Sequence, residues 1–445
     1  MQELFMDEYE SLASQISDPQ ELTTAQANLV GQWLAINPKA MFDELRPAQP
    51  IFESPRATII TRRADVLEIL ARDSEFSEAI YTPRMQRVNA HFFLGMPNSA
   101  EYEREVSAVR LAAGRSDLAQ IQQLVIREAQ KIITQLSVGE CSQDKIGRLD
   151  LVKDLARVVP ACFVESYLGV TGPDQQTLQS WMRALFWDLF GNLTNDATVI
   201  GAADEAAEGV KDYLIEAIAK RKAAMNAGTD VPNDVMTRLL RLQSSDLSLD
   251  DEGIRRNLTG LAVGAIETTS ECVTNIIDVL LDRPEMLAAA QKAAAQDNNT
   301  FQGFVLEALR FKPQHPFLYR VCMSDCKIAR GTPRETLIPA GTFVIAAVWS
   351  AMFDETVIDA PENFRVGRPD SDYILFGSGR HTCFGAYINR VQITEICRSV
   401  LSLKGLRRKK GDEGHIKYDG PFPDSLILEF DIKVKKGDKE LEHEA

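Results

Sequence analysis

The sequence lacks the features that mark membrane proteins and nucleic-acid binders. Its longest apolar stretch, residues 337–353, is interrupted by Pro339 and Gly341 and is too short to cross a bilayer as a helix. Residues 1–15 are acidic from the third position onward and show neither the basic region nor the apolar core of a signal peptide. Basic residues are outnumbered, with 49 Lys and Arg against 64 Asp and Glu and a formal net charge of −15, whereas a nucleic-acid binder normally carries a basic face. We therefore expect a cytoplasmic protein that binds neither a membrane nor nucleic acid.

Cysteine is also scarce in the arrangements that stabilise small secreted domains. Seven cysteines are scattered over 445 residues, which is typical of a reducing compartment rather than of a disulfide framework. Cys322 and Cys326 are close in sequence, but no second pair of ligands accompanies them, as a zinc site would require. Apolar residues make up 45% and charged residues 25%, and this ordinary globular mixture excludes extended disorder.

Helical patterns dominate the first half of the sequence, joined by short polar connections. Residues 50–77 are an exception, because Ala57–Thr61 is β-branched and extended before helical spacing of apolar residues begins at Ala64.

The longest helix signal runs from about Ser248 to Asp282, with Ser248 and Asp251 arranged as a capping box. Such a helix would be about 50 Å long at about 1.5 Å per residue. Its middle, residues 258–273, is apolar nearly all round and should be buried. Glu267 lies in this stretch, where a carboxylate is costly unless it has a partner or a task. From the residues alone, a satisfied core glutamate and a functional one are equally good interpretations.

The strongest signal is the segment FGSGRHTCFG, residues 376–385, which places a cysteine among three glycines. Gly377 and Gly379 permit a tight turn with unusual φ angles. An apolar, strand-like run at residues 373–376 precedes the turn, and a helix is predicted from residue 386 onward. Cys383 would then lie near a helix N-terminus, which favours a thiolate, and a thiolate held in this way can ligate a haem iron. Most of the other cysteines are better interpreted as small buried hydrophobic residues.

Two further motifs accompany this loop. Residues 307–310 are Glu-Ala-Leu-Arg, and residues 361–368 are Pro-Glu-Asn-Phe-Arg-Val-Gly-Arg. Together and in this order, the three segments resemble the Glu-x-x-Arg, Pro-x-x-Phe-x-x-x-Arg and cysteine-loop motifs of the cytochrome P450 family, the haem-thiolate monooxygenases. The first motif alone is close to noise, but its place before the other two makes the set specific. The resemblance extends over about residues 50–433.

The resemblance implies a mainly α-helical fold with small β-sheets, in which haem b lies between the long central helix and the cysteine-loop helix. It implies a single catalytic domain over residues 1–445, with an ordered core at about 50–433, a short N-terminal extension and a charged C-terminal tail.

The resemblance also implies roles for individual residues. Cys383 would be the thiolate ligand of the haem iron. The expected partners of the haem propionates and ring are His381, Arg320, Arg110 (with Arg104 as the alternative), Phe376, Gly377 and Gly385. A buried charge network with a structural rather than a catalytic role is expected from Glu307, Arg310 and Arg368, and such a network persists only when it is fully paired.

Residues 264–269, GAIETT, resemble the segment of the family's central helix that supports dioxygen activation. There a hydrogen-bonded acid and alcohol deliver protons in a dry pocket, and here these residues would be Glu267 and Thr268. The small residues Gly264 and Ala265 would leave room for oxygen.

The sequence departs from the family pattern in three places. Gly264-Ala265 reverses the usual Ala-Gly order. After the cysteine loop the usual Ala-x-Leu-Ala-Arg-x-Glu is AYINRVQ, with Ile388, Asn389 and Gln392 at the altered positions. In EYEREVSAVR, at residues 101–110, one of the two usual haem partners is missing whichever register is chosen.

An apolar pocket for a small organic substrate is expected if the fold holds. Its expected lining residues are Phe186, Trp187, Phe190, Val263, Gly264 and Phe317. The three aromatic residues at 186–190 have helical spacing, and for at least one of them ordinary core packing is the better interpretation.

The leading hypothesis is a monooxygenase that uses dioxygen to hydroxylate or otherwise oxidise a small, mainly apolar molecule. The sequence contains no flavin or iron–sulfur signature, so electrons would come from a separate ferredoxin and its reductase. Arg380, Arg398 and residues 407–410 offer a basic docking face, although a solvated surface is the commoner meaning of such charges.

Two alternatives stay open. One is a haem-thiolate enzyme that uses peroxide or rearranges a hydroperoxide, against which the retained Glu267 and Thr268 count. The other is a non-catalytic haem or ligand-binding protein, which the retained Cys383 makes the weaker hypothesis.

Overall fold

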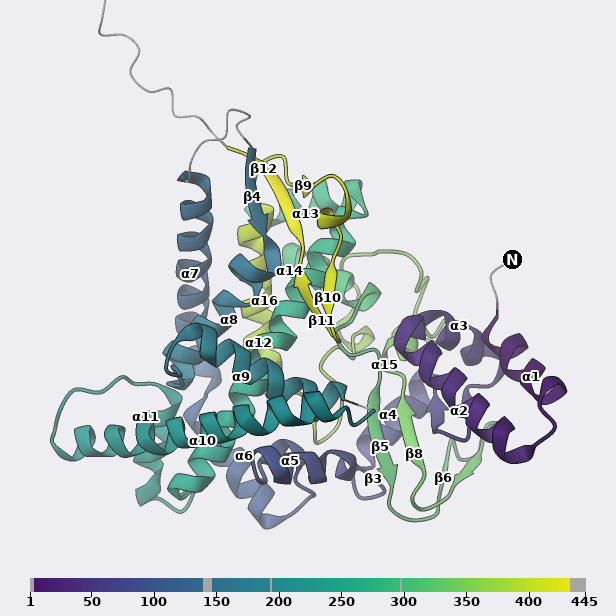
Figure 1. Ribbon diagram of the computed structural model, residues 1–445. Helices are drawn as coiled ribbons and strands as arrows, with labels where there is room; N and C mark the ends of the chain where they lie inside the picture. The colour runs from purple at the N-terminus through teal and green to yellow at the C-terminus, as the bar shows by residue number, and fades with distance from the viewer. Residues whose placement is uncertain (1–3, 139–145, 193, 297, 433–445) are drawn as a thin grey trace, which may run out of the picture. The chain divides into compact units, whose positions relative to one another are not determined.

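The computed structural model describes residues 4–138, 146–192, 194–296 and 298–432 (Figure 1). Helices make up most of it and the strands form small sheets, which confirms the predicted fold class. The chain divides into two compact units, residues 1–111, 242–260 and 309–386 in the first and residues 112–241, 261–308 and 387–445 in the second. A single catalytic domain stays a prediction, and the predicted charged C-terminal tail lies outside the described residues. In the described part of the chain no helix is both long enough and apolar enough to span a membrane.

The first unit contains a five-stranded sheet, a two-stranded sheet and short helices. Its helices are α1 Phe5–Gln15, α2 Pro19–Ile36, α3 Pro38–Ala48, α4 Arg63–Ala71, α5 Thr82–Val88, α6 Ala100–Ala112 and α15 Val348–Ala351. Its strands are β1 Ile51–Glu53, β2 Thr58–Ile60, β3 Phe76–Ser77, β5 Leu318–Cys322, β6 Cys326–Ile328, β7 Thr336–Ile338 and β8 Phe343–Ala346. The predicted change from extended chain to helix within residues 50–77 is confirmed by β2 and α4.

The five-stranded sheet is buried on both faces. Its order is β1-β2-β8-β5-β3, with β2 and β8 parallel and the other neighbours antiparallel. Successive residues of a strand point to opposite faces, so Ile60 and Val344 pack with α4 while Ile59 and Ile345 pack with α1–α3. Strand β8 is therefore apolar throughout rather than alternating.

The residues before position 50 form three helices that are built into this sheet's second face. Phe5 and Phe42 are fully buried in the same cluster as Ile59. The Glu44 carboxylate accepts hydrogen bonds from the N–H groups of Phe5 and Met6, at 2.8 and 3.0 Å, and so satisfies the start of α1.

The second unit is more strongly helical. Its helices are α7 Leu118–Val138, α8 Val158–Phe163, α9 Gln175–Phe186, α10 Ala197–Asn226, α11 Val235–Arg241, α13 Pro284–Gln296 and α16 Ala386–Leu401. Its strands are β4 Ile146–Asp150, β9 Arg407–Arg408, β10 Lys417–Asp419, β11 Phe422–Ser425 and β12 Ile427–Asp431, in the sheets β4-β12-β9 and β10-β11. Two helices, α12 Asp251–Leu281 and α14 Asn298–Phe311, contribute residues to both units.

The long helix α12 is confirmed, but its start differs from the prediction. The Asp250 carboxylate accepts the N–H of Gly253 at 2.7 Å, so Asp250 rather than Ser248 caps the helix. Ser248 belongs to the preceding turn, where its N–H donates to the Ser245 carbonyl.

Hydroxyl groups inside α12 are satisfied by the helix itself. Thr259 and Thr274 donate to the carbonyls four residues earlier, at 3.0 and 2.8 Å. Such back-bonding lets a helix that is buried along its middle carry threonines without leaving donors unpaired.

The strand-like run predicted at residues 373–376 is wrong. These residues form turns, with the N–H of Tyr373 donating to Asp370 and the N–H of Gly377 donating to Ile374. Ile374 is buried in the first unit's core, so the apolar run reflects packing and not strand pairing.

Two of the three predicted network residues lie together beneath the segment at residues 359–363. Arg310 and Arg368 are buried and both donate to the carbonyl of Asn363, at 3.2 and 3.0 Å. Arg310 also donates to Met352 O and lies 4.4 Å from the ring centre of Phe353. Glu307, the third network residue, is fully buried. Many contacts in this network are thus hydrogen bonds from a guanidinium group to a backbone carbonyl. They fix the backbone of the segment at residues 359–363.

We predict that Arg310→Met lowers the free energy of unfolding by about 3–5 kcal/mol, because it removes a buried charge and leaves its partners uncompensated. Urea unfolding followed by circular dichroism would measure the loss. Arg365→Met is the matched control, because Arg365 pairs with the exposed Asp359 and such surface pairs contribute about 0–1 kcal/mol. Equal losses in the two variants would contradict the structural role of Arg310.

Candidate active site

The cysteine loop is a tight turn that only glycine allows at one position. Gly377 and Gly379 have φ angles of +72° and +78°. A Cβ atom on Gly379 would lie 2.1 Å from the carbonyl oxygen of Leu70, so no other residue fits without moving the backbone. The N–H of Cys383 donates to the carbonyl of Phe376 at 2.9 Å, which closes the loop immediately before α16.

The loop holds the sulfur of Cys383 in the way that a metal-ligating atom is held. The N–H of Gly385 donates a hydrogen bond to it, and this lowers the thiol pKa. Burial outweighs that effect and raises the pKa of Cys383 above its ordinary value. A metal ion bound at this sulfur would supply the charge that stabilises the thiolate. The donor set fits a haem iron in this respect.

Arg320 and His381 meet at a buried carboxylate, Glu78. Arg320 Nη2 lies 2.8 Å from Glu78 Oε1, an ion pair without hydrogen-bond alignment, and His381 Nε2 lies 3.1 Å from Glu78 Oε2. Burial raises the pKa of Glu78, and the charge of Arg320 opposes this rise. Burial and the Arg320 charge lower the pKa of His381 to about 4, so its imidazole is neutral at physiological pH.

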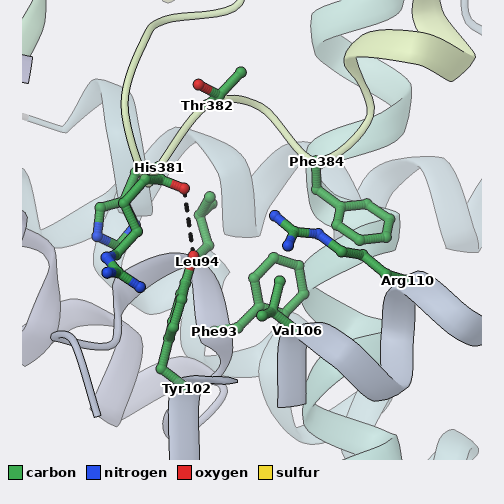
Figure 2. A pocket seen from close by; sticks show the side chains of 9 residues that line it. Phe93, Leu94, Tyr102, Val106, Arg110, His381, Thr382 and Phe384 are labelled. Atoms are coloured by element: carbon green, nitrogen blue, oxygen red, sulfur yellow. Dashed lines mark hydrogen bonds between the residues drawn. The ribbon is translucent and has the colours of Figure 1, made fainter. Parts of the chain in front are cut away.

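Figure 2 shows a recess of the first unit in which His381 and Arg110 lie together. Phe384 and Phe93 line it beside them, with ring centres 5.4 Å apart. Tyr102 from α6 donates its hydroxyl to the carbonyl of Arg380 at 3.3 Å and so holds the loop from the other side. A cation and a loop histidine are groups that can pair with the carboxylates of a haem, and the two phenylalanine rings are surfaces that can pack against its ring.

The recess distinguishes between Arg110 and its alternative, Arg104. Both arginines are exposed on α6, but only Arg110 is among the residues that line the recess.

The basic groups considered for partner docking are paired with acids of their own unit. Arg380 pairs with Asp73 and Glu103, and Arg398 pairs with Glu395. Within residues 407–410, Arg407 pairs with Asp431, Arg408 with Asp278 and Asp282, and Lys409 with Glu413. These pairs favour the ordinary solvated-surface interpretation for those residues.

Glu267 is held by two arginines of the second unit. It is 2% exposed, and its Oε1 and Oε2 atoms lie 3.0 Å from Arg157 and 3.2 Å from Arg183. Burial raises the pKa of Glu267, while the charges and hydrogen bonds of Arg157 and Arg183 oppose the rise. Arg183 also binds the exposed carboxylate of Asp419 at 2.8 Å. Arg157 and Arg183 thus compensate the charge of the buried Glu267 carboxylate.

Thr268 does not hydrogen-bond to Glu267, contrary to the expected acid–alcohol pair. Its hydroxyl donates to the carbonyl of Gly264 at 2.7 Å, because adjacent residues of a helix point in different directions. A Cβ atom on Gly264 would meet nothing within 4 Å, so this turn of α12 faces open space. The neighbouring Val263 is buried.

Two of the departures from the family pattern form one polar contact in the second unit. Gln392 on α16 donates to Thr269 at 3.2 Å and to Asn389 at 3.5 Å. Thr269 in turn donates to Asn389 at 3.4 Å. Asn389 and Gln392, the altered residues, thus form one amide–hydroxyl cluster with Thr269.

The expected pocket aromatics pack closely against their surroundings. Trp187 contacts Phe422 and lies so close to Gly420 that a Cβ atom there would be 2.2 Å from its ring. Phe186 lies 4.8 Å from Phe190 and 5.7 Å from Phe422, between ring centres. In the first unit Phe317 packs against Phe42 and Tyr319. These contacts favour core packing for Trp187, and the substrate-pocket set stays a prediction.

Three functional candidates were missed in the sequence. Glu78, Arg157 and Arg183 occur in segments without a motif and lie far along the chain from the groups they bind. The only available signal was indirect, because a buried glutamate in α12 required a cation from somewhere.

The family model described as Cytochrome P450 matches residues 51–403. Cyclomarin C epoxidase CymV of Salinispora arenicola is 27% identical over 56% of this chain and 58% of its own length. The erythromycin C-12 hydroxylase of Saccharopolyspora erythraea is 30% identical over 56% of this chain and 60% of its own. Matches to these two relatives thus span less than two thirds of their length.

Other matches extend further along the chain. Pulcherriminic acid synthase of Bacillus subtilis is 22% identical over 89% of this chain and 95% of its own. The crystal structure of P450BioI with a fatty-acid-ligated acyl carrier protein has a TM-score of 0.75 at 20% identity, over 90% of this chain and all of that one. CalO2 has the same TM-score and identity over 89% of this chain and 96% of its own. At these identities the two structures show a common fold.

We predict that Glu267→Gln lowers the free energy of unfolding by about 3–5 kcal/mol, because Arg157 and Arg183 then lose a buried counter-charge. Urea unfolding would measure this. Asp419→Asn is the matched control, since it removes the exposed partner of the same Arg183 and should cost less than about 1 kcal/mol. A Glu267→Gln variant as stable as the parent would show that the two arginines do not depend on this carboxylate.

Proposed function

The chain belongs to the cytochrome P450 family, and from that premise we propose that it is a haem-thiolate monooxygenase. The reaction is the hydroxylation or a related oxidation of a small, mainly apolar organic molecule by dioxygen. Two observations support it: the glycine-bounded loop that carries Cys383, and relatives whose names are those of an epoxidase and a hydroxylase. The cysteine loop is the observation that carries the proposal.

Haem is the family's cofactor, and we assign haem b to this chain, with Cys383 as its thiolate ligand. The haem supplies the dioxygen chemistry when it is bound. The loop's part is to fix the sulfur and to tune it through the Gly385 N–H, since hydrogen bonds to a ligand sulfur adjust its electron donation. Phe376 and Gly377 contribute the carbonyl and the turn that keep the loop closed.

Arg320, His381 and Arg110 hold the haem propionates in this proposal. All three belong to the first unit, and Arg320 and His381 already contact the carboxylate of Glu78. Glu78 orients Arg320 and His381, and the neutral imidazole of His381 donates a hydrogen bond rather than a charge.

Thr268 and Glu267 deliver protons to the reaction in this proposal. The Thr268 hydroxyl faces the open turn of α12 at Gly264 and can exchange its present carbonyl partner for a reacting oxygen atom. Glu267 is the buried acid of the same turn, and Arg157 and Arg183 fix its orientation and its charge. The arginines are positioning residues.

Electrons come from separate proteins, a ferredoxin and its reductase in this proposal, because the sequence holds no flavin or iron–sulfur motif. Such partners and the acidic, cysteine-poor composition are consistent with a cytoplasmic enzyme.

The reduced protein with carbon monoxide tests the thiolate ligand. We expect a Soret band shifted far to the red, which is lost in Cys383→Ser and kept in Cys397→Ser. Cys397 is a suitable control because it is fully buried in α16, the helix that follows the loop. A band typical of neutral histidine ligation in the parent protein, or a red-shifted band in Cys383→Ser, would refute both the ligand and the monooxygenase.

The hydroxyl of Thr268 is tested by Thr268→Val, which we expect to lower product formation by about 10²-fold or more while the carbon monoxide spectrum stays unchanged. Thr274→Val is the matched control, because Thr274 makes the same back-bond on the same helix, to Ser270 at 2.8 Å. Product formation per electron consumed, with a competent redox pair and a substrate found by spectral screening, is the measurement. Full activity in Thr268→Val would favour the peroxide-using alternative.

A further inference from the structure

Two thiols of the first unit lie in contact at the end of β5. The sulfur atoms of Cys322, the last residue of β5, and Cys326, the first residue of β6, are 3.6 Å apart. Both side chains belong to the core cluster on the α4 face of the sheet, with 0% and 7% exposure. We propose that Cys322 and Cys326 are an oxidation site, a dithiol that a peroxide converts into an intramolecular disulfide. This inference does not rest on the proposed function.

The backbone holds the two cysteines in this position independently of each other. Cys322 exchanges hydrogen bonds with the β8 side of the sheet, its N–H donating to Thr342 and its carbonyl accepting from Gly341, at 2.9 and 2.7 Å. Cys326 pairs with Ile338 in the two-stranded sheet of β6 and β7. An S–S bond of about 2.05 Å requires the two sulfur atoms to approach by about 1.5 Å.

The Cys322 thiol also lies 3.1 Å from the Ser324 carbonyl and 3.5 Å from the Ile338 carbonyl. A structural metal is not indicated, because the described residues hold no group of three or more His, Cys, Asp or Glu placed to bind one.

The two thiols are not equivalent, and the difference assigns their roles. Arg72 donates to the carbonyl of Lys327 at 2.8 Å, which puts a guanidinium beside Cys326, although Glu68 and Glu75 share that charge. Burial and the hydrogen bond with Cys326 raise the pKa of Cys322 to about 11. We therefore assign Cys326, beside this guanidinium, as the sulfur that attacks the oxidant and Cys322 as the sulfur that resolves the product.

The chemistry balances with hydrogen peroxide as the oxidant. The Cys326 thiolate attacks one oxygen atom, the O–O bond breaks, and a sulfenic acid and hydroxide form. The Cys322 sulfur then attacks the Cys326 sulfur, the S–S bond forms and the S–O bond breaks. The Cys322 thiol proton leaves with the hydroxyl group as water, and the hydroxide of the first step takes up the proton that Cys326 lost on becoming a thiolate. Two thiols thus lose two hydrogen atoms in total, and one peroxide yields two waters.

The turn at residues 323–325 joins the two cysteines and is the exposed part of this site. All three residues of the turn are exposed, and the side chain of Met323 is 52% exposed. Met323 is thus an internal reporter of oxidant access, because its thioether forms a sulfoxide when peroxide reaches it.

The experiment is a peptide map of the haem-loaded protein after graded doses of hydrogen peroxide, removed by catalase. The protein is then unfolded, alkylated without reductant and digested with trypsin, which cleaves after Arg320 and Lys327. The peptide 321–327, VCMSDCK, contains these two cysteines and Met323. We expect it to lose two hydrogen atoms and to take up no alkyl group at doses below those that form the Met323 sulfoxide. Prior reduction should restore two alkyl groups.

The matched variant is Cys326→Ser, in which Cys322 should stay open to alkylation at the same doses. In the parent protein, two alkylated cysteines beside an oxidised Met323 would overturn the proposal, since the oxidant would have reached the turn without joining the thiols. Sulfinic or sulfonic acids at Cys326 in place of the disulfide would overturn it as well.

Discussion

Burial of charged side chains is the constraint on which both units depend. Glu267 lies almost out of solvent between two arginines, and Glu78 lies between Arg320 and His381. An ion removed from water costs several kcal/mol unless a partner compensates it, so each of these groups requires the element that carries its partner to be in place. The geometry of the proposed catalytic and cofactor-binding groups therefore depends on the same contacts that stabilise the fold.

The parts of the site that were predictable are those determined within a few residues. The loop at residues 376–385 could be predicted because its glycines, its cysteine and the start of α16 follow one another in the sequence. The structure gives the reason for one of these glycines, since Gly379 has no room for a side chain beside Leu70. The middle of α12 and the change from strand β2 to helix α4 could be predicted equally well, because hydrophobic periodicity is a local property of the sequence. The family motifs added the roles that periodicity alone does not give.

What escaped prediction is what the fold brings together from afar. Nothing near Glu267 in sequence indicates that Arg157 and Arg183 will bind it, and Glu78 sits in a segment without a motif. The apolar run at residues 373–376 was misjudged as strand-like because burial in a turn and burial in a strand select the same residues. The departures Asn389 and Gln392 gain a meaning only once Thr269 of α12 is seen beside them.

Arg183 serves two carboxylates at once, the buried Glu267 and the exposed Asp419 of the β10–β11 hairpin. Groups that share a partner do not contribute additively to stability. Asp419 is dispensable only while Glu267 is present, because without that carboxylate it becomes a principal counter-charge of the guanidinium. Substitutions at the two positions are therefore epistatic, and the order in which a lineage or a mutant library acquires them decides which are tolerated.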